Sequence, residues 1–288
     1  MTGTGQQRLV PMVFLMPALL ILGGFVLAGF AQVAYYSFTE YSAFSDPKWV
    51  GISNYTELLG RGDFLRCLAN SAMYLLVTPA IVGLSLVAAM SVASGIRGAG
   101  WYRVAFFLPV VTPTIVAALA WRVLYDENSG LLNAGLEVVG IGGVRWLSEK
   151  PWTLVAAMLV TVWKGFGFYM MVLLAALVAV PRDLKEAAAL DGAGRMGTFR
   201  HVVLPSIWPA LALVGVVSSI SALKVFDEIF VTVKGTPITH QTVVPLMYQL
   251  AFERGRFGLA SAAGMMLFAV ILALSVLNLR LSRRGGAA

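Results

Sequence analysis

Side chains able to do covalent or acid–base chemistry are sparse in this chain of 288 residues. Cys67 is the single cysteine, so no internal disulfide and no multi-cysteine metal site is available. The histidines are His201 and His240, and neither belongs to an HExxH pattern. The CxxC pair and the phosphate-binding Gly-x-x-x-x-Gly-Lys-Ser/Thr loop are also absent from the sequence. We therefore expect no catalytic residue, no metal site and no cofactor in this chain, and an enzyme is disfavoured.

The densest group of charged residues inside the apolar part of the chain lies in residues 185–207, KEAAALDGAGRMGTFRHVVLPSI. Asp183 and Glu186 have the spacing of a capping box, and the run 184–190 is rich in strong helix formers. Gly192 is expected to end that helix, because glycine tolerates a left-handed turn. A helix of about two turns is marginal alone in water. The segment is therefore either a solvated connecting loop or a docking element for a partner, and composition leaves both open.

Long apolar runs must position these few polar residues. Hydrophobic residues make up 59% of the chain and charged residues 12%, with a mean hydropathy of +0.82. Soluble domains have about 25% charged residues, so this composition predicts a membrane protein. Runs of about 18 or more apolar residues are long enough to span a bilayer as helices. We predict an all-α polytopic membrane protein with a single membrane domain over residues 1–288, and six transmembrane helices at roughly 9–38, 70–94, 101–124, 152–180, 203–225 and 259–281.

Basic residues are denser in the short segments 97–103, 182–200 and 280–284 than in the longer segments on the other side of the spans. By the positive-inside rule, these segments and both chain termini are predicted to be cytoplasmic. His201 and His240 then lie on opposite sides of the membrane, which excludes a metal site made from the pair. The net charge of +7 is distributed over helix ends rather than gathered in one patch, so we expect contact with membrane lipid and not with nucleic acid.

The six predicted spans contain no aspartate and no glutamate. Ion-coupled carriers usually place Asp, Glu or His inside the bilayer, so an ion-coupled secondary carrier is a disfavoured alternative. Lys164 is the central ionisable residue of the spans, with Lys224 and Arg122 nearer to span ends. The two lysines either extend to a membrane interface or face a ligand cavity. Any transport against a gradient must draw its energy from another chain.

The charged segment also carries a family resemblance. Its residues match the EAA loop of ABC importer permeases at Glu186, Ala187, Ala188, Asp191, Gly192, Ala193, Phe199, Leu204, Pro205 and Pro209. The runs FLPVVTPTIVAALAWRVLY (107–125), WKGFGFYMMVLLAALVAVPRDL (163–184), LKVFDEIFV (223–231) and AFERGRFGLASA (251–262) are similar to the first permease subunit of maltose- and glycerol-phosphate-type sugar importers. The resemblance covers nearly the whole chain. The chain departs from it at residues 234–237, KGTP, where the family commonly has a Gly-Gly-Pro run.

The resemblance implies a subunit of a binding-protein-dependent importer in a bacterial plasma (inner) membrane, with the type I permease fold. The loop 182–205 would contain a cytoplasmic coupling helix that contacts an ATPase through Glu186, Ala187, Ala188, Asp191, Gly192 and Ala193. The implied partners are a second homologous permease, two ATPase subunits that bind ATP and Mg, and an extracytoplasmic solute-binding protein that delivers the sugar. The chain would then be a transport subunit that forms half of the translocation pathway.

Sugar contacts in maltose-type relatives come from the spans before and after the coupling loop. By position, the resemblance implies substrate-binding residues at Thr161, Lys164, Gly165, Phe168, Tyr169, Ser218, Ser221 and Ala222. Hydroxyls and an ammonium can hydrogen-bond sugar hydroxyls, and an aromatic ring can cover a sugar ring, but ordinary helix packing is the alternative for each residue. We expect a di- or oligosaccharide as the solute, and Lys164 leaves glycerol-3-phosphate or a glycerophosphodiester as the alternative. The sequence does not name the solute.

Overall fold

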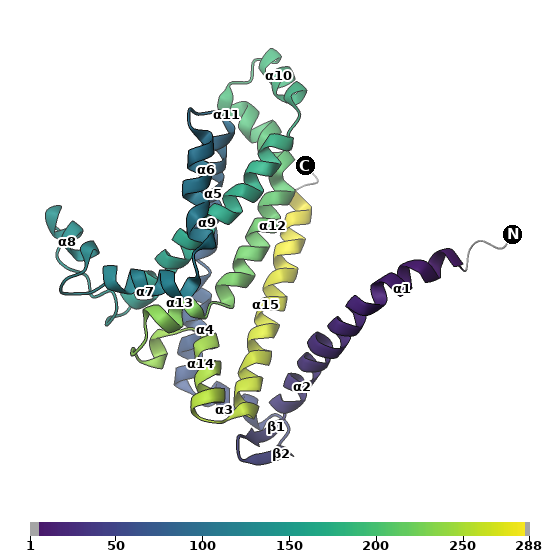
Figure 1. Cartoon of the computed structure of the whole chain (residues 1–288), viewed down its shortest axis with the longest axis vertical. Coiled ribbons are helices and arrows are strands. Elements are labelled where there is room, and N and C mark those ends of the chain that lie inside the picture. The colour runs from purple at the N-terminus through teal and green to yellow at the C-terminus, as the bar shows by residue number, and fades with distance from the viewer. Residues whose placement is uncertain (1–5, 286–288) are drawn as a thin grey trace. The chain divides into compact units, whose positions relative to one another are not determined.

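The computed structural model describes residues 6–285, with side chains from residue 14 to residue 280, and the described part is almost entirely helical (Figure 1). Five of its helices are long and apolar enough to cross a membrane, and the number is six if one strongly bent pair counts as a crossing. The predicted all-α membrane architecture is therefore confirmed. The predicted side of the two termini falls on residues 1–5 and 286–288, which lie outside the described residues.

The chain forms two compact units. One consists of the chain up to Arg61 together with Met247–Met266, and the other of Gly62–Leu246 together with the chain from Leu267 onward. The first unit begins with a long apolar helix, of which Phe14–Ser37 is long enough to span a membrane and is not buried within the protein. Its elements are α1 (Gln6–Ile21), a π-helical turn (Leu22–Leu27), α2 (Ala28–Ser37), β1 (Thr39–Ser42), β2 (Ser45–Trp49) and α3 (Ser53–Gly60).

Polar contacts hold the first unit together around the antiparallel hairpin of β1 and β2, in which Thr39 lies opposite Trp49. Asn54 on α3 donates to the carbonyl oxygens of Ser37 and Thr39 at 3.0 and 2.9 Å. Arg256, just before α15 (Phe257–Gly285), forms a bidentate ion pair with Glu57 at 2.6 Å. This guanidinium holds the pKa of the Glu57 carboxyl below its usual value. The start of α15 therefore lies beside α3.

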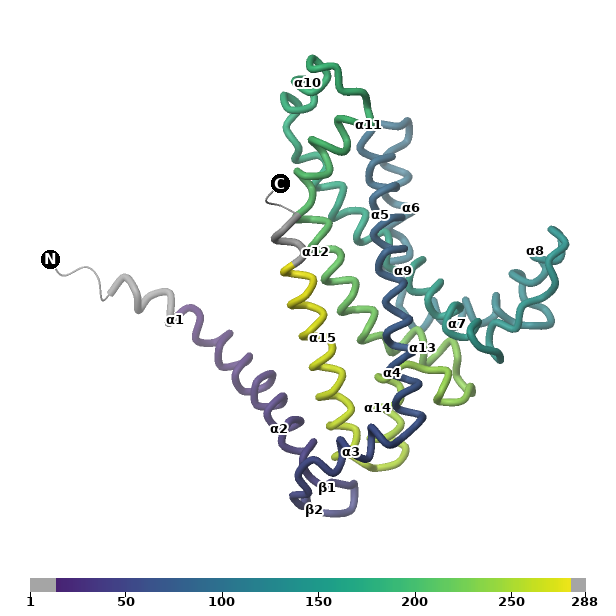
Figure 2. Tube along the Cα trace, turned by 180° about the vertical axis from the view of Figure 1, so that it is seen from behind, coloured from purple at the N-terminus to yellow at the C-terminus, as the bar shows by residue number. Residues whose placement is uncertain are grey.

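The second unit contains the helices from Gly62 to Leu246 and the part of α15 from Leu267 onward, and the two views in Figures 1 and 2 show α5, α6 and α9 running side by side within it. Its elements are α4 (Gly62–Tyr74), α5 (Val77–Ala93), α6 (Ala99–Val111), α7 (Thr114–Leu124), α8 (Leu131–Val138), α9 (Trp152–Ala179), α10 (Arg182–Leu190), α11 (Arg195–Thr198), a π-helical turn (Phe199–Val203), α12 (Leu204–Leu223), α13 (Asp227–Thr232) and a 3-10 turn (Ile238–His240). α14 (Val243–Tyr248), a π-helical turn (Gln249–Glu253) and α15 follow.

Helix α9 is the centre of the second unit and packs against α5, α6, α7, α12 and α13. Met170 and Leu173 on α9 are fully buried, in one apolar cluster with Ile81 of α5 and Val214 of α12. Inside a bilayer the hydrophobic effect does not drive helices together, so this association depends on close side-chain packing and on interhelical hydrogen bonds. The predicted span at 152–180 corresponds to α9.

The second predicted span begins earlier in the structure than the sequence suggested. The continuous apolar run is Gly62–Ala93, made of α4 and α5, where we predicted residues 70–94. The polar side chain of Asn70 is satisfied inside this segment, because its amide donates to the carbonyl oxygens of Thr239 and Gln241 at 2.9 and 2.7 Å. These bonds also anchor the loop that follows residues 234–237.

The third predicted span, at 101–124, is wrong as a single straight helix. It consists of α6 and α7, which are bent by 97° relative to each other. Thr112 and Pro113 separate them in extended conformation, with ψ of 129° and 130°. Proline lacks an N–H and disfavours helical geometry at the residue before it, so the helix breaks at this pair. α7 then packs mainly against α13 and also contacts α9.

Gly167 allows α6 to approach α9 closely. A Cβ atom at this position would collide with the backbone carbonyl of Phe106. Small residues at such crossings are typical of membrane helix pairs, because they let two backbones come together. The ring of Phe106 packs edge-on against Phe166 next to this crossing, with ring centroids 5.5 Å apart.

We predict that Gly167→Ala lowers the thermal unfolding temperature of the detergent-purified protein. An overpacked helix contact costs about 1–3 kcal/mol, and each kcal/mol shifts the unfolding temperature by about 2–4 °C for a domain of this size. Gly215→Ala is the matched control, because its added Cβ meets no atom within 4 Å. Equal unfolding temperatures for the two variants would contradict the close α6–α9 approach.

Candidate functional site

One face of α9 combines the polar residues Thr161 and Lys164 with Gly165 and Phe168. Thr161, Lys164, Gly165 and Phe168 follow the i, i+3, i+4, i+7 spacing of a single helix face. This face looks onto α12, which contributes Ser218, and the two helices pack against each other.

All eight residues that the resemblance implied for substrate binding line one cavity of about 200 Å³. Five elements of the second unit form its walls: α5, α6, α9, α12 and α13. The lining residues are the eight expected ones, Thr161, Lys164, Gly165, Phe168, Tyr169, Ser218, Ser221 and Ala222, together with Val77, Ile81, Val110 and Glu228. The structure thus brings the expected residues together, and whether a solute binds between them stays a prediction.

The hydroxyl groups of the cavity are held in defined positions. Tyr74, which is fully buried on α4, shares a hydrogen bond of 2.6 Å with the hydroxyl of Thr161. The Ser218 hydroxyl donates to the carbonyl oxygen of Val214 at 2.7 Å, which leaves its lone pairs free to accept a further bond. Tyr169 on α9 and Ser221 on α12 both line the cavity with their hydroxyl-bearing side chains. Two helices, α9 and α12, therefore present hydroxyl groups to the cavity.

Aromatic surface lies next to these hydroxyls. The rings of Phe168 and Tyr169 pack edge to face, with centroids 5.3 Å apart. Phe168 is 46% exposed although its neighbours on α9 are buried. An exposed ring beside hydroxyl groups can cover the apolar face of a sugar ring while the hydroxyls bind its polar edge.

Two opposite charges line the cavity, Lys164 from α9 and Glu228 from α13. Among the described residues no ion pair within 4 Å joins them. Burial raises the pKa of the Glu228 carboxyl, which lies outside the spanning helices, and the nearby Lys164 ammonium opposes that rise. Lys224, the other lysine considered from the sequence, does not line this cavity.

Glu228 is the site residue that sequence reasoning missed. It lies three residues beyond the end of the fifth predicted span, so it was not counted among groups inside the membrane. α13 folds back against α7 and α9, and this return brings the carboxylate to the cavity. The bend of α7 that makes room for α13 was itself not predicted, so the sequence offered no signal for this position.

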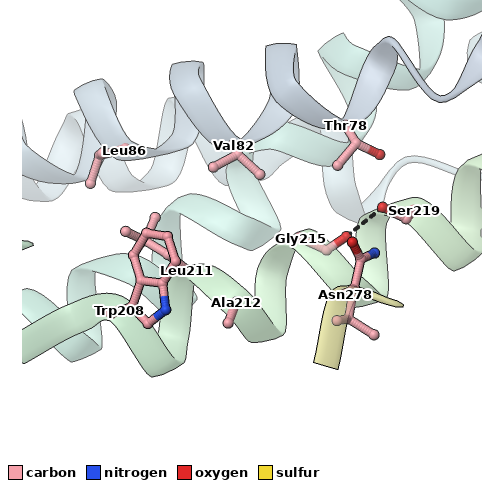
Figure 3. Close-up of a pocket in the computed structure, with 10 residues that line it drawn as sticks. Thr78, Val82, Leu86, Trp208, Leu211, Ala212, Gly215, Ser219 and Asn278 are labelled. Atoms are coloured by element: carbon pink, nitrogen blue, oxygen red, sulfur yellow. Dashed lines mark hydrogen bonds between the residues drawn. The ribbon is translucent and has the colours of Figure 1, made fainter. Parts of the chain in front are cut away.

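Two other cavities of the second unit are less suited to a polar solute. One of about 370 Å³ lies between α5, α12 and α15, and no charged residue is among the described residues that line it (Figure 3). The hydroxyl of Ser219 in its wall donates to the carbonyl oxygen of Gly215 at 2.6 Å (Figure 3). The other, of about 630 Å³ between α5, α6 and α9, is lined by apolar and aromatic residues apart from Ser91 and likewise carries no charged residue.

The second candidate site is the short helix α10, at the end of the second unit where α9 stops and α12 begins (Figure 1). None of its residues is buried, and Leu190 is 89% exposed. Of the residues implied in partner contact, Glu186, Ala187, Asp191 and Gly192 are exposed, while Ala188 and Ala193 are half-buried. The exposed Ala187, Ala189 and Leu190 give α10 apolar surface that is open to solvent or to a partner.

Gly192 ends α10 as the sequence predicted. Its φ of +80° is in the left-handed region that glycine adopts without strain. The amide of Gly192 donates to the carbonyl oxygen of Ala189 at 3.1 Å, and that of Ala193 to Ala188 at 2.9 Å, which is the Schellman pattern. The glycine therefore closes the helix and turns the chain toward α11.

The predicted capping box at the start of α10 is wrong. The helix begins at Arg182, with Pro181 before it, and no side chain caps its first amides. Asp183 lies inside the first turn instead. Proline fixes the chain just ahead of the first turn, and the carboxylate of Asp183 stabilises the positive end of the helix dipole without a capping bond.

Comparison with known proteins finds one family model, described as "binding-protein-dependent transport system inner membrane component", which matches residues 81–285. The diacetylchitobiose uptake system permease of Streptomyces coelicolor is 35% identical over 279 residues, covering 91% of this chain and 79% of that protein. The trehalose/maltose transport system permease of Thermococcus litoralis is 31% identical over 238 residues, covering 82% and 80%. A bacterial alginate ABC transporter, solved in complex with an alginate pentasaccharide-bound periplasmic protein, has a TM-score of 0.82 at 20% identity, covering 98% of this chain and 96% of that one.

We predict a measurable coupling between Tyr74 and Thr161 in a double-mutant cycle of thermal unfolding. Interhelical hydrogen bonds in membrane proteins contribute about 0.6 kcal/mol on average in such cycles. Tyr74→Phe and Thr161→Val should each lower stability, and the double variant should lose less than the sum of the two. Strictly additive losses would show that the 2.6 Å contact does not stabilise the protein.

Proposed function

Because the chain belongs to the family of binding-protein-dependent transport system inner membrane components, we infer that it is the membrane-spanning permease subunit of a sugar importer. The family establishes a multi-pass protein of the inner membrane and a transport component rather than an enzyme. The helical ABC importer permease fold predicted from the sequence is confirmed by the fold of the alginate transporter. The solute, the contacts and the coupling described below are our proposals.

The observation that carries the sugar assignment is the cavity between α9, α12 and α13. It combines hydroxyl groups at Thr161, Ser218 and Ser221 with an exposed phenylalanine ring and two charged groups. A sugar has hydroxyls that donate and accept, and ring faces that are apolar, so each of these features has a matching part on the solute. The diacetylchitobiose and trehalose/maltose systems named for the relatives support the same class of solute.

The size of the cavity supports a pathway shared between two permeases. Its volume of about 200 Å³ is below the roughly 300–1,000 Å³ of pockets that enclose drug-sized ligands. A di- or oligosaccharide therefore needs further walls, which a second homologous permease would supply. Each chain would then form half of the translocation pathway.

The energy for import is proposed to come from an ATPase that binds α10. The sequence contains no phosphate-binding loop and no acidic residue in its predicted spans, which supports an energy source outside this chain. The exposed α10 surface at Glu186, Ala187 and Leu190 suits contact with such a subunit. ATP and Mg would be bound by two ATPase subunits on the cytoplasmic side, where the positive-inside rule also places both termini. A solute-binding protein would deliver the sugar from the opposite side.

We predict that Phe168→Ala lowers sugar uptake by the assembled importer about tenfold, which corresponds to a loss of about 1.4 kcal/mol in binding. The lost ring no longer covers the solute, while the membrane insertion of the chain is unaffected. Phe25→Ala is the control, because Phe25 is 81% exposed and does not line the cavity. Uptake can be followed with radiolabelled disaccharides in proteoliposomes, and wild-type uptake by the Phe168 variant would contradict the assignment of this cavity.

We predict that Gly192→Val leaves the protein in the membrane but uncouples ATP hydrolysis from uptake. A β-branched residue in the left-handed region costs about 1–2 kcal/mol, so the end of α10 should rearrange. Gly194→Val is the matched control, because Gly194 has an ordinary φ of −68°. Uptake and ATP hydrolysis are measured in the same proteoliposomes. Normal uptake by the Gly192 variant would argue against α10 as the coupling element.

A further inference from the structure

The charge balance of the cavity depends on one pair of residues. Lys164 and Glu228 are its charged lining residues, and the other described lining residues are uncharged. They come from different helices, α9 and α13, so the chain brings an ammonium and a carboxylate to the same cavity by folding rather than by local sequence. Counted as an ammonium and a carboxylate, the pair makes the cavity neutral overall.

The two groups remain able to bind a solute. No direct ion pair within 4 Å joins Lys164 to Glu228 among the described residues, and the Lys164 ammonium makes no hydrogen bond within the part of the chain that the structure describes. An ammonium offers three donors and no acceptor, whereas a carboxylate offers acceptors only. The cavity therefore presents a strong donor and a strong acceptor at separate points of its wall.

We infer that Lys164 and Glu228 together make the site selective for neutral, hydroxyl-rich sugars against anionic solutes, an inference that rests on the proposed function. A sugar hydroxyl can accept from the ammonium while another donates to the carboxylate. An anion such as a phosphate ester or a uronate would gain from Lys164 but meet repulsion from Glu228, because like charges in one cavity are unfavourable. A site that repels the wrong solute gains specificity without binding the right one more tightly.

Two further charged residues lie near the cavity without lining it. Asp227 precedes Glu228 on α13 but does not line the cavity, and Lys224 lies at the end of α12, also outside it. The two have opposite signs, so their fields act in opposite directions on the cavity. Lys164 considered alone left a glycerophosphodiester as an alternative solute, and the carboxylate of Glu228 now argues against it.

The test is a charge-swap experiment on the assembled importer, reconstituted with its ATPase, its second permease and its solute-binding protein. Uptake is measured for radiolabelled diacetylchitobiose, maltose and trehalose as neutral probes, and for an alginate-derived oligouronate as the anionic probe. Glu228→Gln and Lys164→Gln should each lower uptake of the neutral sugar that the wild type transports by about tenfold, since each leaves an unbalanced charge and removes a solute contact. The double variant Lys164→Glu with Glu228→Lys keeps one donor and one acceptor, and should recover uptake to within about threefold of the wild type.

Matched controls separate the pair from its surroundings. Asp227→Asn and Lys224→Gln remove neighbouring charges that do not line the cavity, and both should transport as the wild type does. Co-purification of the partner subunits shows that each variant assembles. If Glu228→Gln or Lys164→Gln does not assemble, it is replaced by Glu228→Asp or Lys164→Arg. These two variants keep the charge, so their loss of uptake should be smaller than the tenfold loss expected when the charge is removed.

The outcomes are distinguishable. Normal uptake of the neutral sugar by both Glu228→Gln and Lys164→Gln would overturn the proposed role of this pair in selectivity. The proposed function as a sugar importer would be unaffected. Uptake of the oligouronate but of none of the neutral sugars by the wild type would also overturn that role, with the import function intact. A wild-type complex that fails to bind an ATPase or to take up any of the probes would overturn the proposed function and the inference with it.

Discussion

The close packing of α9 against α5, α6 and α12 is the constraint on which the rest of the second unit depends. In a bilayer no water is available for backbone groups, so the chain must be helical, and helices must then associate without a hydrophobic driving force. Gly167 lets the α6 backbone come against α9, and Met170 and Leu173 fill the space toward α5 and α12. A cavity with defined walls can exist only because this packing is tight around it.

The same helix connects the two candidate sites. The cavity face of α9 ends at Phe168 and Tyr169, and α10 begins at Arg182 after the proline that ends α9. At 1.5 Å per residue, the part of α9 between Tyr169 and its end at Ala179 is about 15 Å long. A rigid element of this kind is a suitable carrier for the proposed coupling, since a displacement of α10 by a partner would move the cavity face on the same helix. The buried residues of α9 between the cavity and α10, such as Leu173 and Leu177, are packed against neighbouring helices, so bending α9 between the two sites would disrupt this packing.

Local sequence rules accounted for some features and failed at others for identifiable reasons. The stop at Gly192 was predictable, because a left-handed turn at a helix end depends on a single residue. The spans at α9 and α12 were predictable from apolar length, and the resemblance placed eight residues that the fold then brought around one cavity. The 97° break at Thr112 and Pro113 was missed because a Pro inside an apolar run can also be tolerated in a membrane helix. The capping box failed because Pro181 already set the start of α10.

By itself, the sequence determined that this chain is a helical membrane protein and that residues 182–205 include a short glycine-terminated helix. These are properties of composition and of neighbouring residues, so they follow from local physical chemistry. Only the tertiary structure decided that Lys164 faces a cavity rather than a membrane interface, and that Glu228 faces the same cavity. Residues 64 positions apart in sequence meet there because α7 bends away and α13 folds back against α9. Whether two such distant residues come to line the same cavity depends on how the helices pack, and a local sequence pattern does not determine that packing.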